Sequence, residues 1–490
     1  MTTILIEPHS DEPNTNSDID LLRSEQSSHR DTEPLQPETP QMRWSDRVRL
    51  NQPQSNSIVA AAFIFMSGGM HIAYTFIPPD THTSTAWFVG AIIGTIIGST
   101  VCDFLGKKLL FLLSACFVIL GGVLLVSLPN NNGALLAGRY IDGFASGLLF
   151  APLLVLAGEE SVKSLRGMLA ALHETDSFAL GIFVYFIPIS TGSSNTDQSL
   201  TSEQTLGIVS IFYGIMPLII IFFYFVESPV YHLVHNDENQ AIDSLRRLQR
   251  PLVITSETYQ QLEEHKAYVA HNKEMSLLQS IVYGLPALLK LCLFRSVVAL
   301  SFSKMTYYAF ATASLIGYSA ETWTLIVMGL LRWLGVLIST HIIDTVGRKK
   351  VVLIGAIVCG GMAIGIGIIM DTPQNLMDED KMRILLYLYF VFQFFAGICI
   401  ASSSAYLSEA FPLVVKPYYI GIAFIVELLV QIICLTAFDF TDTASYFYVT
   451  AAIFLALFLY GLLTLPETKH DTLLEAQIKF KQLLHSSYLN

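Results

Sequence analysis

The chain has 490 residues, of which 52% are hydrophobic and only 14% are charged, and its formal net charge is −12. A mean hydropathy of +0.53 excludes an ordinary soluble globular protein and indicates a chain that lies mostly within a lipid bilayer. The acidic balance gives no sign of nucleic-acid binding, so the partner expected from composition is the bilayer.

Residues 1–56 form a polar segment with acidic residues, proline and serine throughout. Such a segment cannot bury enough apolar surface to fold, so we expect a disordered cytoplasmic tail. Within it, Asp18-Ile-Asp-Leu21-Leu22 fits an acidic dileucine sorting pattern. The plasma membrane is the expected location, and this pattern keeps an endosomal membrane open as the alternative.

Twelve apolar runs of about 20 residues follow the tail, and each is long enough to cross a bilayer as an α-helix. The six cysteines all lie in or at these runs without disulfide spacing, so we interpret them as small core residues. The sequence therefore predicts an all-α membrane protein with twelve transmembrane helices. The expected spans are 58–78, 84–102, 109–128, 134–157, 168–190, 205–226, 292–318, 322–343, 351–370, 384–408, 417–438 and 443–465.

Lysines and arginines gather on alternate sides of the predicted spans. They precede the first span and follow the second, fourth, sixth and eighth, whereas the loops between carry few. Because positively charged loops stay on the cytoplasmic side of a membrane, both termini are predicted to be cytoplasmic. The residues that set this orientation are Arg43, Arg47, Arg49, Lys107, Lys108, Lys163, Arg166, Arg246, Arg247, Arg250, Arg348, Lys349 and Lys350.

The two halves of the chain repeat three landmarks in the same order. Asp103-Phe-Leu-Gly-Lys-Lys108 follows the second span, and Asp344-Thr-Val-Gly-Arg-Lys349 follows the eighth. The fourth and tenth spans both end in a glutamate seven residues before a basic residue, and a Glu next to or near a proline follows the sixth and twelfth. Parallel repeats of this kind predict two pseudo-symmetric six-helix bundles with a substrate site between them. The expected parts are an N-terminal bundle at 57–226, a cytoplasmic connector at 227–291, a C-terminal bundle at 292–465 and a cytoplasmic tail at 466–490.

With these motifs the chain, over roughly 57–475, resembles the sugar porter family of the major facilitator superfamily. Gly138-Arg139 and Glu409-Ala-Phe-Pro412 also fit, whereas Val226-Glu-Ser-Pro229 departs from the family's usual Pro-Glu-Ser-Pro-Arg. The resemblance implies a major facilitator fold that moves a small organic solute, sugar-like in kind, by alternating access. No nucleophile elbow, phosphate loop or metal-ligand cluster occurs in the sequence, so we expect no enzyme activity, no cofactor and no metal site.

The repeated motifs carry the charges that a reversible closure requires. Short charge-assisted bonds at a water interface can form and break without burying a core. The resemblance implies that these charges lock the cytoplasmic side of the carrier. The expected gate is Lys108–Glu159–Arg166 with Glu227 in the first half and Lys349–Glu409–Lys416 with Glu467 in the second, together with Asp103 and Asp344.

Charged residues also lie inside the apolar spans, where each costs about 2.5–3.5 kcal/mol and needs a partner or a wet cavity. Glu174, Arg332 and Glu427 stand where the family has amide side chains, which suit neutral sugars. Two explanations stay open: a charged ligand, or ion-paired side chains that fill part of the cavity, with Glu174 neutralised by Lys304 or Arg332. The expected substrate-binding residues are Glu174, Ser303, Lys304, Tyr307, Tyr308, Arg332, Ser404 and Glu427.

Two side chains are candidate proton sites, which would make protons a coupling ion. His71 lies roughly where proton-coupled sugar porters carry a first-span aspartate, and Glu174 lies in the fifth span. A packed core histidine is the alternative for His71. For the whole chain we expect a carrier of a small-molecule solute. Two other functions stay open: a proton-coupled carrier of a charged organic solute, and a nutrient sensor that has the transporter fold but does not translocate.

Overall fold

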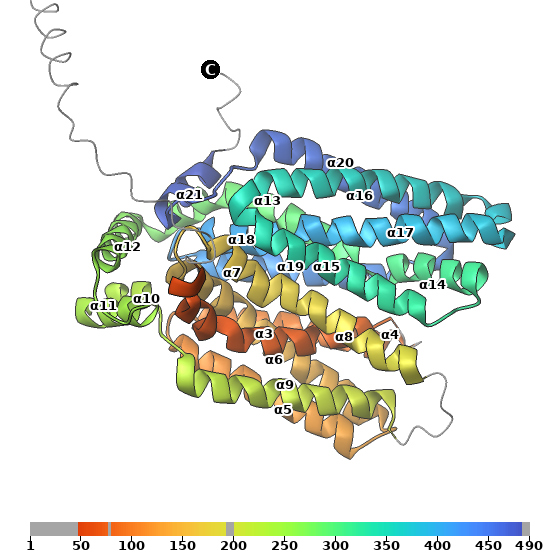
Figure 1. Ribbon diagram of the computed structural model, residues 1–490, viewed down its shortest axis with the longest axis horizontal. Coiled ribbons are helices and arrows are strands. Elements are labelled where there is room, and N and C mark those ends of the chain that lie inside the picture. The colour runs from red at the N-terminus through yellow and green to blue at the C-terminus, as the bar shows by residue number, and fades with distance from the viewer. Residues whose placement is uncertain (1–47, 77–79, 193–199, 483–490) are drawn as a thin grey trace, which may run out of the picture. The chain divides into compact units, whose positions relative to one another are not determined.

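The computed structural model describes residues 48–76, 80–192 and 200–482, and within these ranges every regular element is a helix (Figure 1). Most of the predicted tail, up to residue 47, lies outside the described residues, as does the sorting pattern at 18–22. The first span, α3 (Gln52–Tyr74), begins inside the stretch predicted as tail.

The N-terminal bundle follows the predicted order of apolar runs. Asp80 and Asn131 start α4 and α6 by accepting hydrogen bonds from backbone N–H groups of the first turn, as N-capping residues do. A π-helical segment of five residues, η1, interrupts the fifth span, and such segments are frequent at functional sites. After α3 the helices are α4 (Thr81–Val101), α5 (Lys107–Ser127), α6 (Asn132–Glu160), α7 (Arg166–Ala171), η1 (Leu172–Asp176), α8 (Ser177–Gly192) and α9 (Ser202–Tyr224).

Three short helices connect the bundles: α10 (Pro229–Val234), α11 (Glu238–Arg247) and α12 (Ser256–Glu274). The next helix begins at Leu277, so the expected end of the connector at 291 falls inside it. The seventh and tenth spans each divide into two helices. The C-terminal bundle contains α13 (Leu277–Ser301), α14 (Lys304–Tyr318), α15 (Trp323–Val346), α16 (Arg348–Asp371), η2 (Pro373–Met377), α17 (Glu379–Ile400), α18 (Ser402–Glu409), α19 (Lys416–Thr436), η3 (Phe440–Asp442) and α20 (Thr443–Thr464), and is followed by α21 (Leu473–Lys481).

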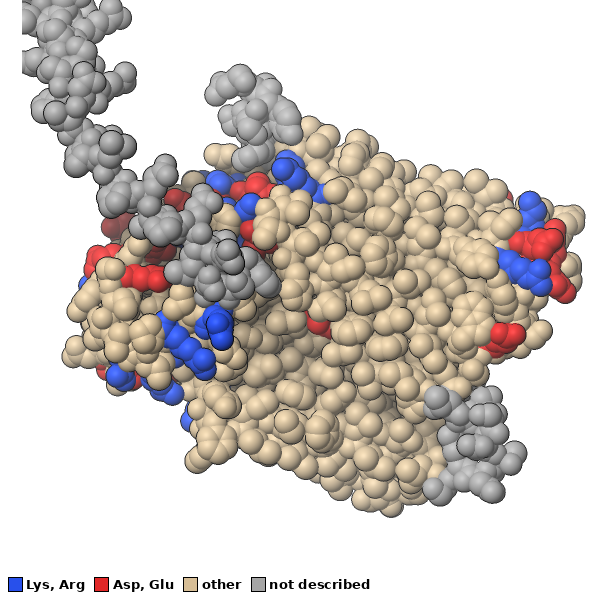
Figure 2. Space-filling view, viewed as in Figure 1, with Lys and Arg blue, Asp and Glu red and all other residues tan. Residues whose placement is uncertain are grey.

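Eleven helical segments of the described chain are long and apolar enough to cross a membrane. The segment missing from these eleven is the fifth predicted span, which η1 divides into pieces that are each too short to qualify alone. With it the number of spans is twelve. In Figure 2 the charged side chains gather toward the two ends of the helices, and a broad band between them is almost free of charge on this face. These features confirm the predicted all-α architecture with twelve spans.

The most extensive contacts between the two bundles are those of α4 with α19 and of α8 with α15. Within each half the same helices pack alike: α4 lies against α6, and α15, its counterpart, lies against α17. Figure 1 shows the connector helices and α21 at one end of the bundles, where the repeated motifs also lie. We call this end the motif end.

The α4 and α6 backbones touch through glycines. A Cβ at Gly94 would lie 2.1 Å from the carbonyl oxygen of Phe144, and one at Gly143 would lie 2.0 Å from that of Trp87. Side chains never come so close, so these positions allow the helix contact because they carry no Cβ.

We predict that Gly94→Ala lowers the free energy of unfolding by about 1–3 kcal/mol, because the two helices must separate. Gly361→Ala is the matched control, since a Cβ there meets nothing within 4 Å. Alanine favours a helix over glycine by about 0.5–1 kcal/mol, so the control should be neutral or slightly stabilised. Thermal unfolding of the purified variants measures the difference, and equal melting temperatures would contradict the close packing.

Candidate functional site

A buried arginine, Arg295 of α13, lies at the centre of the interface between the bundles. Its Nη2 atom lies 3.1 Å from Oε1 of Glu174 and 2.5 Å from Oε2 of Glu427. Its Nη1 atom donates to the hydroxyl of Ser403 at 3.1 Å. Glu174 belongs to η1 of the N-terminal bundle, whereas Arg295 and Glu427 belong to the C-terminal bundle. The Arg295–Glu174 ion pair therefore joins the two bundles.

Two aromatic rings hold the same guanidinium from the side. Phe150 of α6 and Phe424 of α19 stack with their centroids 3.7 Å apart, and Cζ of Arg295 lies 5.1 and 5.7 Å from these centroids. A guanidinium interacts favourably with aromatic rings through cation–π attraction. Arg295 is thus held by two carboxylates and two rings, and both bundles contribute to each set.

The prediction that Lys304 or Arg332 neutralises Glu174 is wrong, because Arg295 does so. The Nζ atom of Lys304 instead donates to the carbonyl of Leu435 at 3.1 Å. Sequence reasoning missed Arg295, although it is a charge inside the seventh predicted apolar run. The rule that singled out the other buried charges would also have found it.

Arg332 of α15 is the second buried guanidinium near the centre, and it is held by neutral groups. Nη1 donates to Oε1 of Gln393 at 3.0 Å and Nη2 to the hydroxyl of Ser301 at 3.1 Å. Its Cζ atom lies 5.0 Å from the ring centroid of Phe302. In the described part of the chain, its Nε atom makes no hydrogen bond and no carboxylate lies within ion-pair distance.

These groups line a narrow cavity between the bundles, with a free volume of about 50 Å³. That volume suits a few water molecules, so a sugar-sized solute would enter only if the bundles moved apart. Three of the predicted substrate residues, Glu174, Arg332 and Glu427, line the cavity together with Arg295. The rest of the wall is largely apolar, as in most sites for small molecules.

The other predicted substrate residues lie around the cavity, outside the lining that the described residues form. Ser303 caps α14 and its hydroxyl lies 2.8 Å from that of Tyr446. Ser404 is closer to the centre, since its hydroxyl donates to Oε2 of Glu174. Lys304 lies over the ring of Tyr308 at 5.4 Å.

Aromatic contacts join the bundles on the side away from the motif end. Tyr307 stacks on Phe76 with centroids 5.7 Å apart, and Phe302 packs edge-on against Phe76 at 5.2 Å. Phe183 of α8 stacks on Trp333 of α15 at 5.7 Å. Tyr307 therefore takes part in an apolar closure between the bundles.

His71, the other candidate proton site, lies beside a carboxylate inside the N-terminal bundle. Its Nε2 atom lies 3.7 Å from Oδ2 of Asp142, and both side chains are buried. Asp142 accepts hydrogen bonds from the hydroxyl of Ser67 at 2.6 Å and from Nε1 of Trp87 at 2.9 Å. Because Trp87 also lines the central cavity, one side chain separates this carboxylate from the space for a solute.

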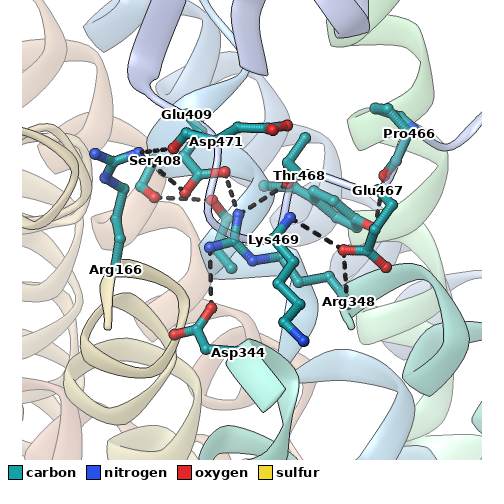
Figure 3. A network of polar contacts seen from close by, with 12 residues as sticks. Arg166, Asp344, Arg348, Ser408, Glu409, Pro466, Glu467, Thr468, Lys469 and Asp471 are labelled. Atoms are coloured by element: carbon teal, nitrogen blue, oxygen red, sulfur yellow. Dashed lines mark hydrogen bonds and ion pairs between the residues drawn. The ribbon is translucent and has the colours of Figure 1, made fainter. Parts of the chain in front are cut away.

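A network of buried charges closes the motif end (Figure 3). Glu409 pairs with Arg348, and its Oε1 atom lies 3.5 Å from Nη1 of Arg166. Arg348 also donates to Asp344 at 3.1 Å, and Asp344 accepts from the backbone N–H of Met168 at 2.7 Å. Arg166 and Met168 belong to the N-terminal bundle and the others to the C-terminal bundle, so the network joins the halves.

The corresponding cluster in the N-terminal bundle is less connected across the interface. Nζ of Lys107 lies 3.6 Å from Oε2 of Glu159 and 3.9 Å from Oε1 of Glu227. The hydroxyl of Ser228 also donates to Glu159. Lys416, the counterpart of Arg166, is buried, and among the described residues its Nζ atom makes no hydrogen bond. The closure is therefore asymmetric.

The ion pairs predicted for Lys108 and Lys349 are wrong by one residue. Lys107 and Arg348 make them instead, because each is the first residue of a helix that begins directly after a glycine and is buried against the acidic cluster. The next residue is rotated by about 100° around the helix, so it faces elsewhere. Lys108 is exposed, and Nζ of Lys349 donates to a backbone carbonyl of α20 at 2.7 Å.

The remaining predicted gate residues have other contacts. Glu467 accepts hydrogen bonds from the backbone N–H groups of Arg348 at 3.1 Å and Lys349 at 3.2 Å, at the start of α16. Asp103 lies in the loop before α5 and is exposed. In α12, burial and, to a smaller extent, the charge of Arg166 lower the pKa of His265 to about 4. At neutral pH the imidazole of His265 is therefore uncharged, so this connector residue adds no charge next to Arg166.

Comparisons with known proteins agree with this architecture. The family model described as "Sugar (and other) transporter" matches residues 80–480. The chain is 26% identical over 407 residues to "Solute carrier family 2, facilitated glucose transporter member 1" of Gallus gallus, covering 80% of this chain and 81% of that protein. It is 23% identical over 409 residues to "Sugar transporter ERD6-like 8" of Arabidopsis thaliana, covering 79% of this chain and 82% of that protein.

Among solved structures, the fold is similar to that of the proton:xylose symporter XylE of E. coli bound to 6-bromo-6-deoxy-D-glucose. The TM-score is 0.70 at 17% identity, and the match covers 88% of this chain and 100% of that one. The family is one of membrane carriers and not of enzymes, which agrees with the expectation from the motifs. The chain belongs to the Sugar (and other) transporter family, and it is a multi-pass membrane carrier with the major facilitator fold.

Proposed function

We propose that the protein moves a sugar-like small organic solute across the plasma membrane by alternating access, with both termini in the cytoplasm. The observation that carries the proposal is a cavity with four charged side chains in its lining, which lies between two bundles whose motif end is closed by the Arg166–Glu409 ion pair. Breaking that pair would let the bundles part and expose the cavity to one side. The basic residues gathered at the motif end support its assignment to the cytoplasm.

In this proposal Glu174, Arg295, Arg332 and Glu427 form the solute site. Glu174 also has a conformational role, because its bond to Arg295 crosses the interface. The charges at the motif end form the gate, since charge-assisted hydrogen bonds give a closure that is stable and still reversible. The aromatic contacts of Phe76 with Tyr307 and Phe302 form the opposite closure.

We predict that the purified protein in liposomes takes up at least one labelled hexose, pentose, polyol or hexuronate with saturation, and that the unlabelled solute competes. Protein-free liposomes are the control for leakage. Binding detected by thermal stabilisation without any uptake would contradict the proposal and favour a sensor with a transporter fold.

Proton coupling is a second candidate function, and the contact between buried His71 and Asp142 favours it. The same liposomes test it: acid outside should accelerate uptake, and Asp142→Asn should abolish the acceleration while exchange of solute continues. Asp243→Asn, at an exposed position in the connector, is the matched control. If the rate of uptake by the unaltered protein does not depend on the pH gradient, the protein is a facilitative carrier.

A further inference from the structure

We infer that the solute is a sugar acid with a single carboxylate, which Arg332 binds at one end of the central cavity. The inference rests on the proposed function and names the substrate class of the same site. It starts from an imbalance among the buried arginines. Arg295 contacts two glutamates, and Arg348 contacts Asp344 and Glu409. Arg332, only 4% exposed, contacts no carboxylate among the described residues.

Arg139 is a useful comparison, because it is a buried arginine whose three guanidinium nitrogens all donate hydrogen bonds although it has no ion pair with a carboxylate among the described residues. Its Nε and Nη1 atoms donate to the backbone carbonyls of Thr83 and His71, and its Nη2 atom donates to the hydroxyl of Thr75. Arg332 differs, because only Nη1 and Nη2 donate and Nε has no partner in the described chain. Arg332 therefore lines the cavity with a guanidinium that contacts no carboxylate among the described residues and keeps an unused Nε donor.

The guanidinium is also held in a fixed orientation. Gln393, which accepts from Arg332, donates in turn to the backbone carbonyl of Ser301 at 3.1 Å and to the hydroxyl of Tyr389 at 2.9 Å. The bonds of Arg332 to Gln393 and Ser301 use two of the five N–H donors of an arginine. The planar fork of the remaining donors matches a carboxylate better than a single hydroxyl.

A second side chain in the cavity lining, Gln431, has an acceptor atom without a hydrogen-bond partner among the described residues, which suits a hydroxyl group of the same solute. Gln431 of α19 lines the cavity, and its Nε2 atom donates to the carbonyls of Ala299 and Phe302 at 3.0 and 2.8 Å. Its Oε1 atom is buried and accepts no hydrogen bond in the described chain. This oxygen suits a donor such as a sugar hydroxyl, so the wall offers one site for an anion and one for a hydroxyl.

The two glutamates limit the charge of the solute to one. Both lie on Arg295, and the three groups together carry a formal charge of −1. Arg332 brings the four charged groups of the lining to a formal charge of zero, so one carboxylate bound at Arg332 leaves a net charge of −1. A second anionic charge on the solute would add to the repulsion from the two glutamates. A monoanionic hexuronate fits these conditions, and a dianionic sugar phosphate does not.

The test compares solutes that differ at one carbon. D-glucuronate carries a carboxylate where D-glucose carries a hydroxymethyl group, and D-glucose 6-phosphate carries a dianion there. In liposomes holding the full-length protein, we expect D-glucuronate to compete for transport at least about tenfold better than D-glucose, because a polar group left unpaired penalises the wrong solute. D-glucose 6-phosphate should compete worse than D-glucose.

Arg332→Gln should reduce this preference for D-glucuronate to about one, and Arg332→Lys should reduce it partly, since a point charge replaces the planar fork. Gln431→Leu should weaken D-glucuronate and D-glucose alike. Arg383→Gln, at an arginine whose ion pairs with Glu379 and Asp380 are exposed, is the matched control and should keep the preference.

The outcomes separate this inference from the proposed function. If the unaltered protein moves D-glucose better than D-glucuronate, the inference is overturned while the proposed function stands. If it moves no sugar-like solute at all, the proposed function itself fails. Should Arg332→Gln not fold, the unaltered protein and Arg332→Lys still decide, because a full preference in Arg332→Lys would contradict carboxylate binding by the guanidinium fork.

Discussion

Replacing Arg295 with glutamine is expected to lower the free energy of unfolding by about 3–5 kcal/mol, the cost of removing one partner from a buried ion pair. The change leaves two carboxylates, Glu174 and Glu427, in an interior where Arg295 is the cation that pairs with both among the described residues. It also removes the cation–π contacts of Arg295 with the stacked rings of Phe150 and Phe424. Thermal and denaturant unfolding of the purified protein in detergent measure the loss.

A triple variant tests whether the loss comes from stranded charge. Changing Glu174, Arg295 and Glu427 all to glutamine removes the three charges together, so most of the stability should return. Arg383→Gln is the control for replacing an arginine, because exposed ion pairs contribute at most about 1 kcal/mol. If the triple variant is less stable than Arg295→Gln alone, neutralisation is not the role of these contacts. Glu174→Gln with Arg332→Asn should give no rescue, since those two residues do not pair.

Replacing Glu409 with glutamine is expected to shift the carrier toward the form that is open at the motif end by about 3 kcal/mol, or on the order of 100-fold in the equilibrium. Glu409 holds Arg166 of one bundle and Arg348 of the other, so its loss leaves two buried cations close together. Arg348 keeps Asp344 and Thr468, so the fold should persist. Transport should slow because the return to the closed form becomes unfavourable.

Labelling of an introduced cysteine measures this shift. Ser408 is fully buried where the bundles meet, and its carbonyl faces Gly158 of the other half. In a background without the six native cysteines, Ser408→Cys should react faster from the motif end when Glu409→Gln is present. Glu159→Gln is the matched control, because its bonded partners Lys107 and Ser228 lie on its own side of the interface. Equal effects of both changes would contradict the asymmetric closure.

The number and order of the spans were predictable because an apolar run of about 20 residues has few alternatives to a transmembrane helix. Length and hydropathy could not show that the fifth span contains η1. That π-helical segment holds Glu174 at the interface, and its formation depends on the contacts that the helix makes in three dimensions. The start of α13 at Leu277 could likewise not be predicted from hydropathy, because its first turns carry polar residues such as Gln279 and Ser280.

The sequence by itself determined that this protein is a twelve-span carrier with two repeated halves, and that Glu174, Arg332 and Glu427 lie near its centre. Hydrophobic length and motif spacing are local properties, so they can be read without a fold. Only the tertiary structure decided which charges pair. Arg295 and Glu174 are 121 positions apart in the chain, and the choice of Lys107 over Lys108 depends on a rotation of about 100° around one helix. Pairing depends on how helices rotate against each other, and that rotation is set by packing across the whole interface.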